Sequence, residues 1–156
     1  MQENARISNK ELAARAGIAP STCSERVRRL ETSGVFRGYH ADVDPQVLGI
    51  GLEAMIAVRL RRHTAGEVDG FRQHAAAMPE VLSVSHVTGA NDFLVHVVVR
   101  DADHLRDLAV VGFTTLPEVE HIETALVFEH LGKRSLPDLT APTPGAVTPG
   151  AGRRSR

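Results

Sequence analysis

The residues with the most distinctive chemistry lie on a short predicted helix near the N-terminus. Cys23, Val27 and Leu30 follow the spacing i, i+4, i+7 and therefore form one apolar stripe. The opposite face carries hydroxyl, carboxylate and guanidinium groups, on Ser21, Thr22, Glu25, Arg28 and Arg29. Hydroxyls and a carboxylate near the start of a helix can reach base edges, and arginines bind phosphates or guanine. This face predicts contact with double-stranded DNA.

The sequence around this helix supports that interpretation. Ser8 and Glu11 have the spacing of a capping box, which predicts that a first helix begins there. Gly17 suits the left-handed position that ends a helix, and Pro20 suits the first turn of the next one. An isolated helix with arginines is more often a solvated face, but a capped helix, a glycine turn and a basic helix in succession indicate a helix-turn-helix. Residues 35–43 alternate enough to predict a small β-wing.

The central part of the chain predicts a second domain of the α+β class. Apolar residues alternate with other residues over 52–61, which is the pattern of a strand buried on one face. The expected elements are strands over 52–60, 81–88, 93–100 and 119–131, and helices over 68–78 and 105–116. This order predicts a ferredoxin-like βαββαβ fold with both helices on one face of an antiparallel sheet. Because the free face needs a cover, we expect at least a homodimer.

The distribution of charge restricts DNA contact to the N-terminal third. The net charge of −1 combines +1 over residues 1–50, −5 over residues 51–139 and +3 over residues 140–156. An acidic middle argues against nucleic-acid binding there. No apolar run approaches the roughly 20 residues that span a bilayer, and the first residues lack the apolar core of a signal peptide. We therefore expect a cytoplasmic protein without membrane contact.

Two motifs resemble one known family. Residues 6–49 resemble the DNA-binding half of the Lrp/AsnC family, the feast/famine regulators, and residues 87–99, which contain GAND, resemble the loop of the ligand-sensing half. The resemblance extends from Arg6 to about Leu131. It implies a transcriptional regulator with a winged helix-turn-helix followed by a βαββαβ effector (RAM) domain. Such proteins dimerise through their sheets and often form larger homo-oligomers, and many bind an amino acid as effector.

The resemblance also implies roles for individual residues. Residues 20–30 would be the recognition helix, with the five polar side chains named above facing DNA. The effector site would lie at a subunit interface and be lined by Thr88, Gly89, Ala90, Asn91 and Asp92. The N–H groups of a glycine turn can bind a carboxylate, and Asp92 can accept from an ammonium group. The alternative is a plain hairpin turn in which Asp92 satisfies its own backbone.

The start of the chain departs from the family pattern. Family members usually carry a further helix before the residues that correspond to Arg6, whereas only five residues precede Arg6 here. We expect a misassigned or truncated start, because without that helix the apolar stripe would be exposed. The expected organisation is a winged helix-turn-helix over 1–45, a linker over 46–51, an effector domain over 52–137 and a disordered tail over 138–156.

Other reactive side chains do not form a recognisable catalytic or metal motif in the sequence. Four histidines fall on predicted strands: His86, His96, His121 and His130. They lack HxH, HExxH or Cys-His spacing, so we expect no metal and no cofactor. Cys23 is expected to be a core residue, and no acid-base or nucleophilic set predicts an enzyme. An alternative to a DNA-binding regulator is an amino-acid-binding or oligomeric interaction module that no longer binds DNA.

Overall fold

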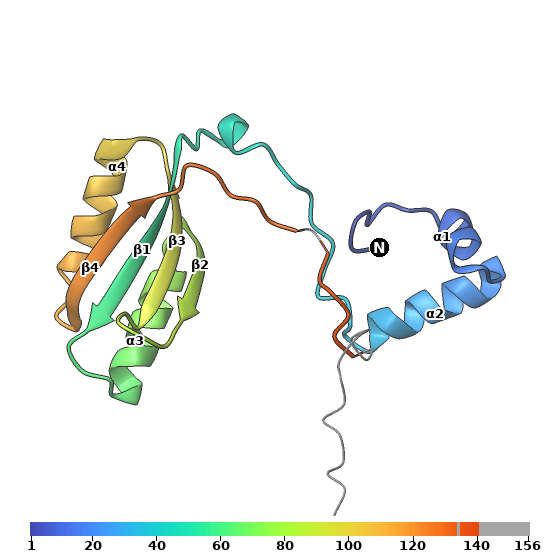
Figure 1. The fold of residues 1–156 in the computed structure, drawn as a ribbon, viewed down its shortest axis with the longest axis horizontal. Coiled ribbons are helices and arrows are strands. Elements are labelled where there is room, and N and C mark those ends of the chain that lie inside the picture. The colour runs from blue at the N-terminus through green and yellow to red at the C-terminus, as the bar shows by residue number, and fades with distance from the viewer. Residues whose placement is uncertain (134, 141–156) are drawn as a thin grey trace, which may run out of the picture. The chain divides into compact units, whose positions relative to one another are not determined.

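The computed structural model describes residues 1–133 and 135–140, which divide into two compact units (Figure 1). The helix-turn-helix unit contains Met1–Ala41 and the described residues from Leu131 onward, and the sheet unit is Asp42–His130. Most of the tail predicted over 138–156 lies outside the described residues. In the part of the chain that the structure describes, no helix is long and apolar enough to cross a membrane.

Two helices form the helix-turn-helix unit, as predicted. α1 (Asn9–Ala16) follows Ser8, whose Oγ accepts the N–H of Glu11 at 3.2 Å. The helix ends at Gly17, whose φ of 66° is a left-handed conformation that glycine adopts without strain. α2 (Pro20–Thr32) has Pro20 in its first turn, where a missing N–H is harmless. Ser8, Gly17 and Pro20 therefore act as the sequence predicted, whereas the carboxylate of Glu11, which would complete a capping box, accepts from Arg15 at 2.8 Å.

The predicted apolar stripe of α2 is only partly buried. Cys23 is buried and Val27 is half-buried, whereas Leu30 is 40% exposed. The reason is the length of the partner helix, because the 8 residues of α1 span about 12 Å and the 13 residues of α2 span about 20 Å. α1 therefore covers only part of the stripe.

Residues 35–43 form no strand, which corrects the prediction of a β-wing. A two-stranded ribbon without further strands is marginally stable at best, so alternation alone does not form one. Side-chain contacts organise this segment instead. The rings of Phe36 and Tyr39 lie 5.9 Å apart, and the Tyr39 hydroxyl donates to a carboxylate oxygen of Glu31 at 3.1 Å. The segment is thereby attached to α2 by a side chain.

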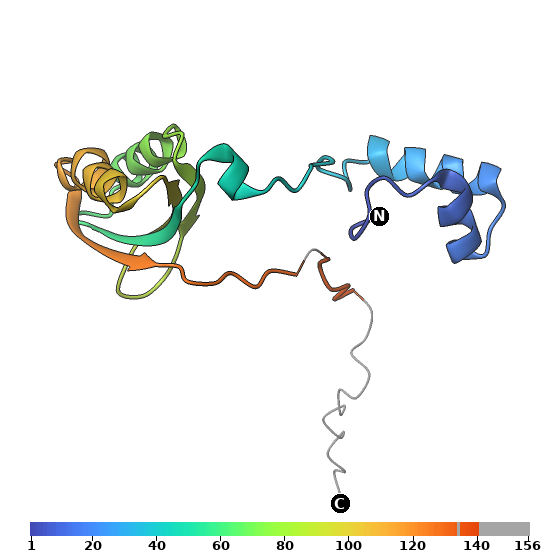
Figure 2. The same cartoon turned by 90° about the horizontal axis from the view of Figure 1, so that it is seen from above.

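The sheet unit has the predicted ferredoxin-like architecture. Its four antiparallel strands are β1 (Leu52–Leu60), β2 (Val81–His86), β3 (Phe93–Val99) and β4 (Val119–Leu126). Their order across the sheet is β2-β3-β1-β4. α3 (Ala65–Ala76) and α4 (Ala102–Asp107) both lie on one face of the sheet (Figure 2).

The core of the sheet unit lies between the helices and the sheet. Alternate residues of the two central strands are buried there: Ala54, Ile56, Val58, Leu60, Phe93, Val95, Val97 and Val99. Phe71 of α3 packs against Phe93 and Phe113, with ring centroids 4.7 Å and 6.1 Å away. The alternation read from the sequence thus corresponds to one buried face.

Most ends of the elements lie within three residues of the predictions, and two elements differ further or in kind. β4 ends at Leu126 rather than at residue 131, because its partner β1 begins at Leu52 and the N–H of Val127 already bonds to the carbonyl of Glu53. The second predicted helix consists of α4 followed by a π-helical stretch, Leu108–Thr114. Gly112 lies in this stretch, where a Cβ atom would come within 2.5 Å of Met78 Cε.

The opposite face of the sheet carries the residues that alternate with the core, and we call it the open face. Its members on β1, β3 and β4 are Glu53, Met55, Ala57, Arg59, Leu94, His96, Val98, His121, Glu123 and Ala125. Met55 is paired with His96 and Ala125, and it is half-buried together with Leu94 and Val98. The open face therefore combines an apolar centre with ionisable groups.

Candidate DNA-binding and effector-binding sites

The polar face predicted for α2 is present on the helix. Ser21, Glu25, Arg28 and Arg29 are exposed and Thr22 is half-buried. At 3.6 residues per turn the five positions fall within an arc of about 120°, on the side away from Cys23. In the described part of the chain, the side chains of Glu25, Arg28 and Arg29 form no ion pair with each other or with other residues. Their charges are therefore available to a partner.

Tyr39 is a polar group that the sequence analysis did not single out. Its hydroxyl donates to Glu31 near the end of α2. Desolvation, followed by the hydrogen bond and the charge of Glu31, raises the pKa of Tyr39 above its ordinary value of 10.0. The hydroxyl is consequently a stable donor at neutral pH. No spacing rule in the sequence points to this pair, which depends on how the segment after α2 turns back.

The effector residues predicted by resemblance form an exposed loop between β2 and β3, which we call the 88–92 loop. Thr88, Gly89 and Ala90 are exposed, and Asn91 and Asp92 are half-buried. Gly89 has a φ of 123°, a backbone conformation that favours glycine. In the described residues, the N–H groups of positions 88 to 91 donate to no protein acceptor. The loop thus offers consecutive free backbone donors.

Asp92 attaches this loop to the end of β1. Its Oδ2 accepts the N–H of Leu60 at 2.8 Å, and its Oδ1 lies 2.8 Å from Nε2 of His63. The backbone N–H of Asp92 also donates to the carbonyl of Val58 at 2.9 Å. Asp92 therefore binds backbone 32 residues earlier in the chain, whereas the hairpin-turn interpretation expected it to satisfy its own backbone. Within the single chain, Asp92 therefore holds the 88–92 loop against the end of β1.

A cavity of about 220 Å³ lies elsewhere in the sheet unit. It is lined by residues 48–50, 79–80, 98–100 and 104. The volume is below the roughly 300–1,000 Å³ typical of ligand pockets, and no residue of the 88–92 loop contributes to it. This cavity and the predicted effector loop are therefore at different places in the sheet unit.

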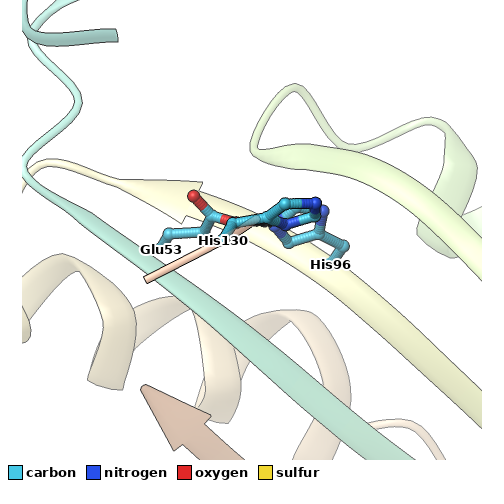
Figure 3. Close-up of side chains that lie close together, drawn as sticks. All are labelled: Glu53, His96 and His130. Atoms are coloured by element: carbon cyan, nitrogen blue, oxygen red, sulfur yellow. Dashed lines mark hydrogen bonds and ion pairs between the residues drawn. The ribbon is translucent and has the colours of Figure 1, made fainter. Parts of the chain in front are cut away.

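Histidines that the sequence analysis set aside meet a carboxylate on the open face. His96 of β3 and His130, which follows β4, both approach Glu53 of β1 (Figure 3). His86 instead stacks on Phe93 at 4.8 Å, and His121 lies 3.6 Å from Glu123. The three residues Glu53, His96 and His130 come from distant parts of the sequence, which explains why no motif spacing identified them.

Comparison with known proteins establishes the family. A sequence profile described as "Lrp/AsnC ligand binding domain" matches residues 53–137, and a profile described as "Winged helix-turn-helix DNA-binding" matches residues 1–37. The chain belongs to the Lrp/AsnC family. It is accordingly a DNA-binding transcriptional regulator with a ligand-binding domain, and not an enzyme.

Individual relatives of this Lrp/AsnC protein cover most of its length. It is 43% identical over 131 residues to the HTH-type transcriptional regulator AldR of Mycolicibacterium smegmatis, covering 84% of this chain and 77% of that protein. A transcriptional regulator of Neisseria meningitidis, solved as an L-methionine complex, aligns with a TM-score of 0.81 and 30% identity over 87% of this chain and 88% of that one. A feast or famine regulatory protein of M. tuberculosis complexed with L-methionine aligns with a TM-score of 0.71 and 29% identity, covering 85% and 87%.

The contacts of Asp92 predict a structural effect that can be measured without any ligand. Asp92→Ala leaves the N–H of Leu60, a buried residue, without its acceptor, so we expect the free energy of unfolding to fall by about 1–3 kcal/mol in urea denaturation. His63→Ala removes only the exposed partner of the same carboxylate and should change stability by less than about 0.5 kcal/mol. An Asp92→Ala protein as stable as the unmodified chain would contradict the positioning role.

Proposed function

We propose that the protein binds a specific double-stranded DNA sequence through α2 as a homo-oligomer, and that an amino acid bound at the 88–92 loop alters its DNA occupancy or its assembly. The observation that carries this proposal is the polar face of α2, whose charged side chains have no ion-pair partner within the described chain. The family supports regulation of transcription in general. Our proposal adds which residues contact DNA, that the effector is an amino acid, and that the chain forms a homo-oligomer.

The side chains on α2 suit different parts of a DNA site. Ser21, Thr22 and Glu25 lie in the first two turns, where short side chains approach base edges in the major groove. Arg28 and Arg29 lie further along the helix, where guanidinium groups bind phosphates or guanine. Phosphate contacts position the protein and base contacts select the sequence. We therefore assign base recognition to the start of α2 and anchoring to its arginines.

The open face supports pairing with a second copy of the chain. Met55, Ala57, Leu94 and Val98 form its apolar centre, and both strands that carry them are central in the sheet. A one-sided antiparallel sheet gains stability when another layer covers its second face. A symmetric dimer would present two copies of α2 to pseudo-palindromic half-sites about one helical turn, or a multiple of it, apart.

The 88–92 loop supports recognition of an amino acid. Consecutive free N–H groups around Gly89 can bind a carboxylate, as backbone nests bind anions. A carboxylate has about four lone-pair sites, so Asp92 retains acceptor capacity for an ammonium group beyond its bonds to Leu60 and His63. Two of the relatives above are complexes with L-methionine, which supports an amino acid as effector here. The open position of the loop suits a site completed by another subunit.

DNA binding through α2 predicts a selective loss when one arginine is removed. We expect Arg28→Ala to weaken binding to the protein's own upstream region by about 1–3 kcal/mol, and a phosphate contact would also reduce the salt dependence by about one unit of slope. Mobility shifts at several salt concentrations measure both effects. The matched control Arg72→Ala removes an exposed arginine from α3 and should leave DNA binding unchanged.

The same experiment separates the two functions that the sequence left open. A chain that shifts no DNA at any salt concentration would support the amino-acid-binding module and contradict the regulator proposed here. Loss of the oligomer in Arg28→Ala, measured by light scattering, would assign Arg28 to packing instead of DNA contact.

The proposed dimer face predicts that a charge placed at its apolar centre prevents association. Leu94→Glu would bury a carboxylate without a partner, so we expect a shift toward monomer in size-exclusion chromatography with light scattering. Val47→Glu introduces the same group at a position that is 78% exposed and should not change the oligomeric state. An unchanged oligomer in Leu94→Glu would show that the subunits pair through another surface.

The proposed effector loop predicts loss of ligand binding when Gly89 is replaced. A side chain at a φ of 123° is strained, so Gly89→Ala should displace the free N–H groups and lower the affinity for the amino acid that titration calorimetry identifies among the twenty. Gly66→Ala lies in α3, where a Cβ meets no atom within 4 Å and alanine favours the helix. Equal affinity in both variants and the unmodified chain would exclude the loop as the effector site.

A further inference from the structure

Three side chains with metal-binding atoms converge on the open face of the sheet (Figure 3). Nε2 of His96 lies 2.5 Å from Oε1 of Glu53, and Nδ1 of His130 lies 3.5 Å from the same oxygen. All three ligand atoms lie within 4.8 Å of one another. Two imidazoles and one carboxylate are therefore aimed at one small volume.

The strand register brings these residues together. Glu53 is paired with Val98 and Met55 with His96, so Glu53 and His96 are diagonal neighbours on adjacent strands. His130 reaches them because the N–H of Val127 donates to the carbonyl of Glu53 at 2.9 Å, which keeps the residues after β4 beside β1. The rings of His96 and His130 are stacked, with centroids 6.0 Å apart and planes at 19°. The backbone thus positions all three ligands.

Burial divides the cluster into a fixed part and an accessible part. The side chains of His96 and Glu53 are 15% and 30% exposed, and that of His130 is 61% exposed. A half-buried pair loses little freedom when it binds an ion, and the exposed histidine leaves a path from solvent. In the single chain the cluster thus combines preorganised ligands with access from solvent.

We propose that Glu53, His96 and His130 form a binding site for a divalent transition-metal ion, with Zn²⁺ as the best fit. Zn²⁺ binds histidine nitrogen and carboxylate oxygen at about 2.0–2.2 Å in a tetrahedron, which places ligand atoms about 3.4 Å apart. The observed separations lie on both sides of that value, so side-chain rotations suffice to admit the ion. Three protein ligands leave a fourth position for water or for a group from another chain.

The bound ion would have a defined structural effect. It would join β1 and β3 to residue 130, beyond the last strand hydrogen bond of β4. Phe128 in the intervening segment is 97% exposed, so few apolar contacts restrain this part of the chain. Metal binding would therefore restrain the segment between the end of β4 and His130, where the chain leaves the sheet unit. All three ligands come from one chain, but two of them lie on the open face where a second copy is proposed to pack, so in the dimer the fourth position would face that copy.

The competing explanation is that Glu53 and His96 form an ordinary ion pair and that His130 only stacks on His96. The chain contains another His–Glu pair that can serve as a control. His121 lies 3.6 Å from Glu123 and is 51% exposed, which is close to the 3.5 Å and 61% found for His130. In the described part of the chain, the His121 pair has no third ligand close enough to form a metal cluster. His121→Gln is therefore a control for His130→Gln.

The experiment is a calorimetric titration of the full chain, without an affinity tag, with Zn²⁺. We expect one ion per chain, an affinity reduced at least about tenfold in His130→Gln and in His96→Gln, and an unchanged affinity in His121→Gln. Titration with Co²⁺ should give the visible absorption of a four-coordinate ion in the unmodified chain and in His121→Gln only. The melting temperature should rise with Zn²⁺ in these same two proteins.

Absence of saturable Zn²⁺ binding would overturn the proposal, and so would equal affinity in His130→Gln and the unmodified chain. His130 lies outside the strands, so its variant should keep the circular dichroism and the metal-free melting temperature of the unmodified chain. If His96→Gln does not fold, His130→Gln still decides the result. A similar loss of affinity in His121→Gln would assign binding to scattered surface histidines and also overturn the site.

Discussion

The pairing of β1 with β3 on one side and β4 on the other is the constraint on which the sheet unit depends. Side chains alternate between the two faces of a strand, so a shift of the register by one residue would turn Ala54, Ile56 and Val58 away from the helices. The packing of Phe71 against this buried set penalises any such shift. Burial of one face therefore determines the position of every group on the other.

The chemistry of the sheet unit follows from this register. At the end of β1 it brings Asp92 to the N–H of Leu60, which fixes the 88–92 loop. At the start of β1 it brings His96 to Glu53. These points are seven residues apart on one strand, or about 23 Å at 3.3 Å per residue. The proposed effector and metal sites consequently lie at opposite ends of β1, with the apolar centre of the open face between them.

The helix-turn-helix unit depends on different forces. Its buried side chains are small, Ala13 and Cys23, and much of its definition comes from a cap, a left-handed glycine and a proline in the first turn. Within the residues that the structure describes, the charged side chains on the outer face of α2 form no ion pairs. Because α2 buries little of its surface within the chain, its hydroxyls, carboxylate and arginines are exposed to a nucleic-acid partner.

The sequence by itself determined the features that depend on nearby residues. Ser8, Gly17 and Pro20 identified the two helices, and alternation over 52–61 identified β1 and its buried face, because these signals act through the local backbone. The βαββαβ order and the polar face of α2 were predicted from periodicity in the same way, and the family was suggested separately by the resemblance of two motifs. Alternation failed over 35–43, where a strand needs a partner that the local sequence does not supply.

Only the tertiary structure decided which distant residues meet. Asp92 binds the N–H of Leu60, and Glu53 meets His96 and His130, because the register of β1 with β3 and the path of the chain after β4 bring them together. Separations of 32 and 43 residues produce no periodic signal in a sequence. The end of β4 was likewise set by the length of its partner strand. A contact that depends on the folding of a whole sheet is visible only when the sheet is formed.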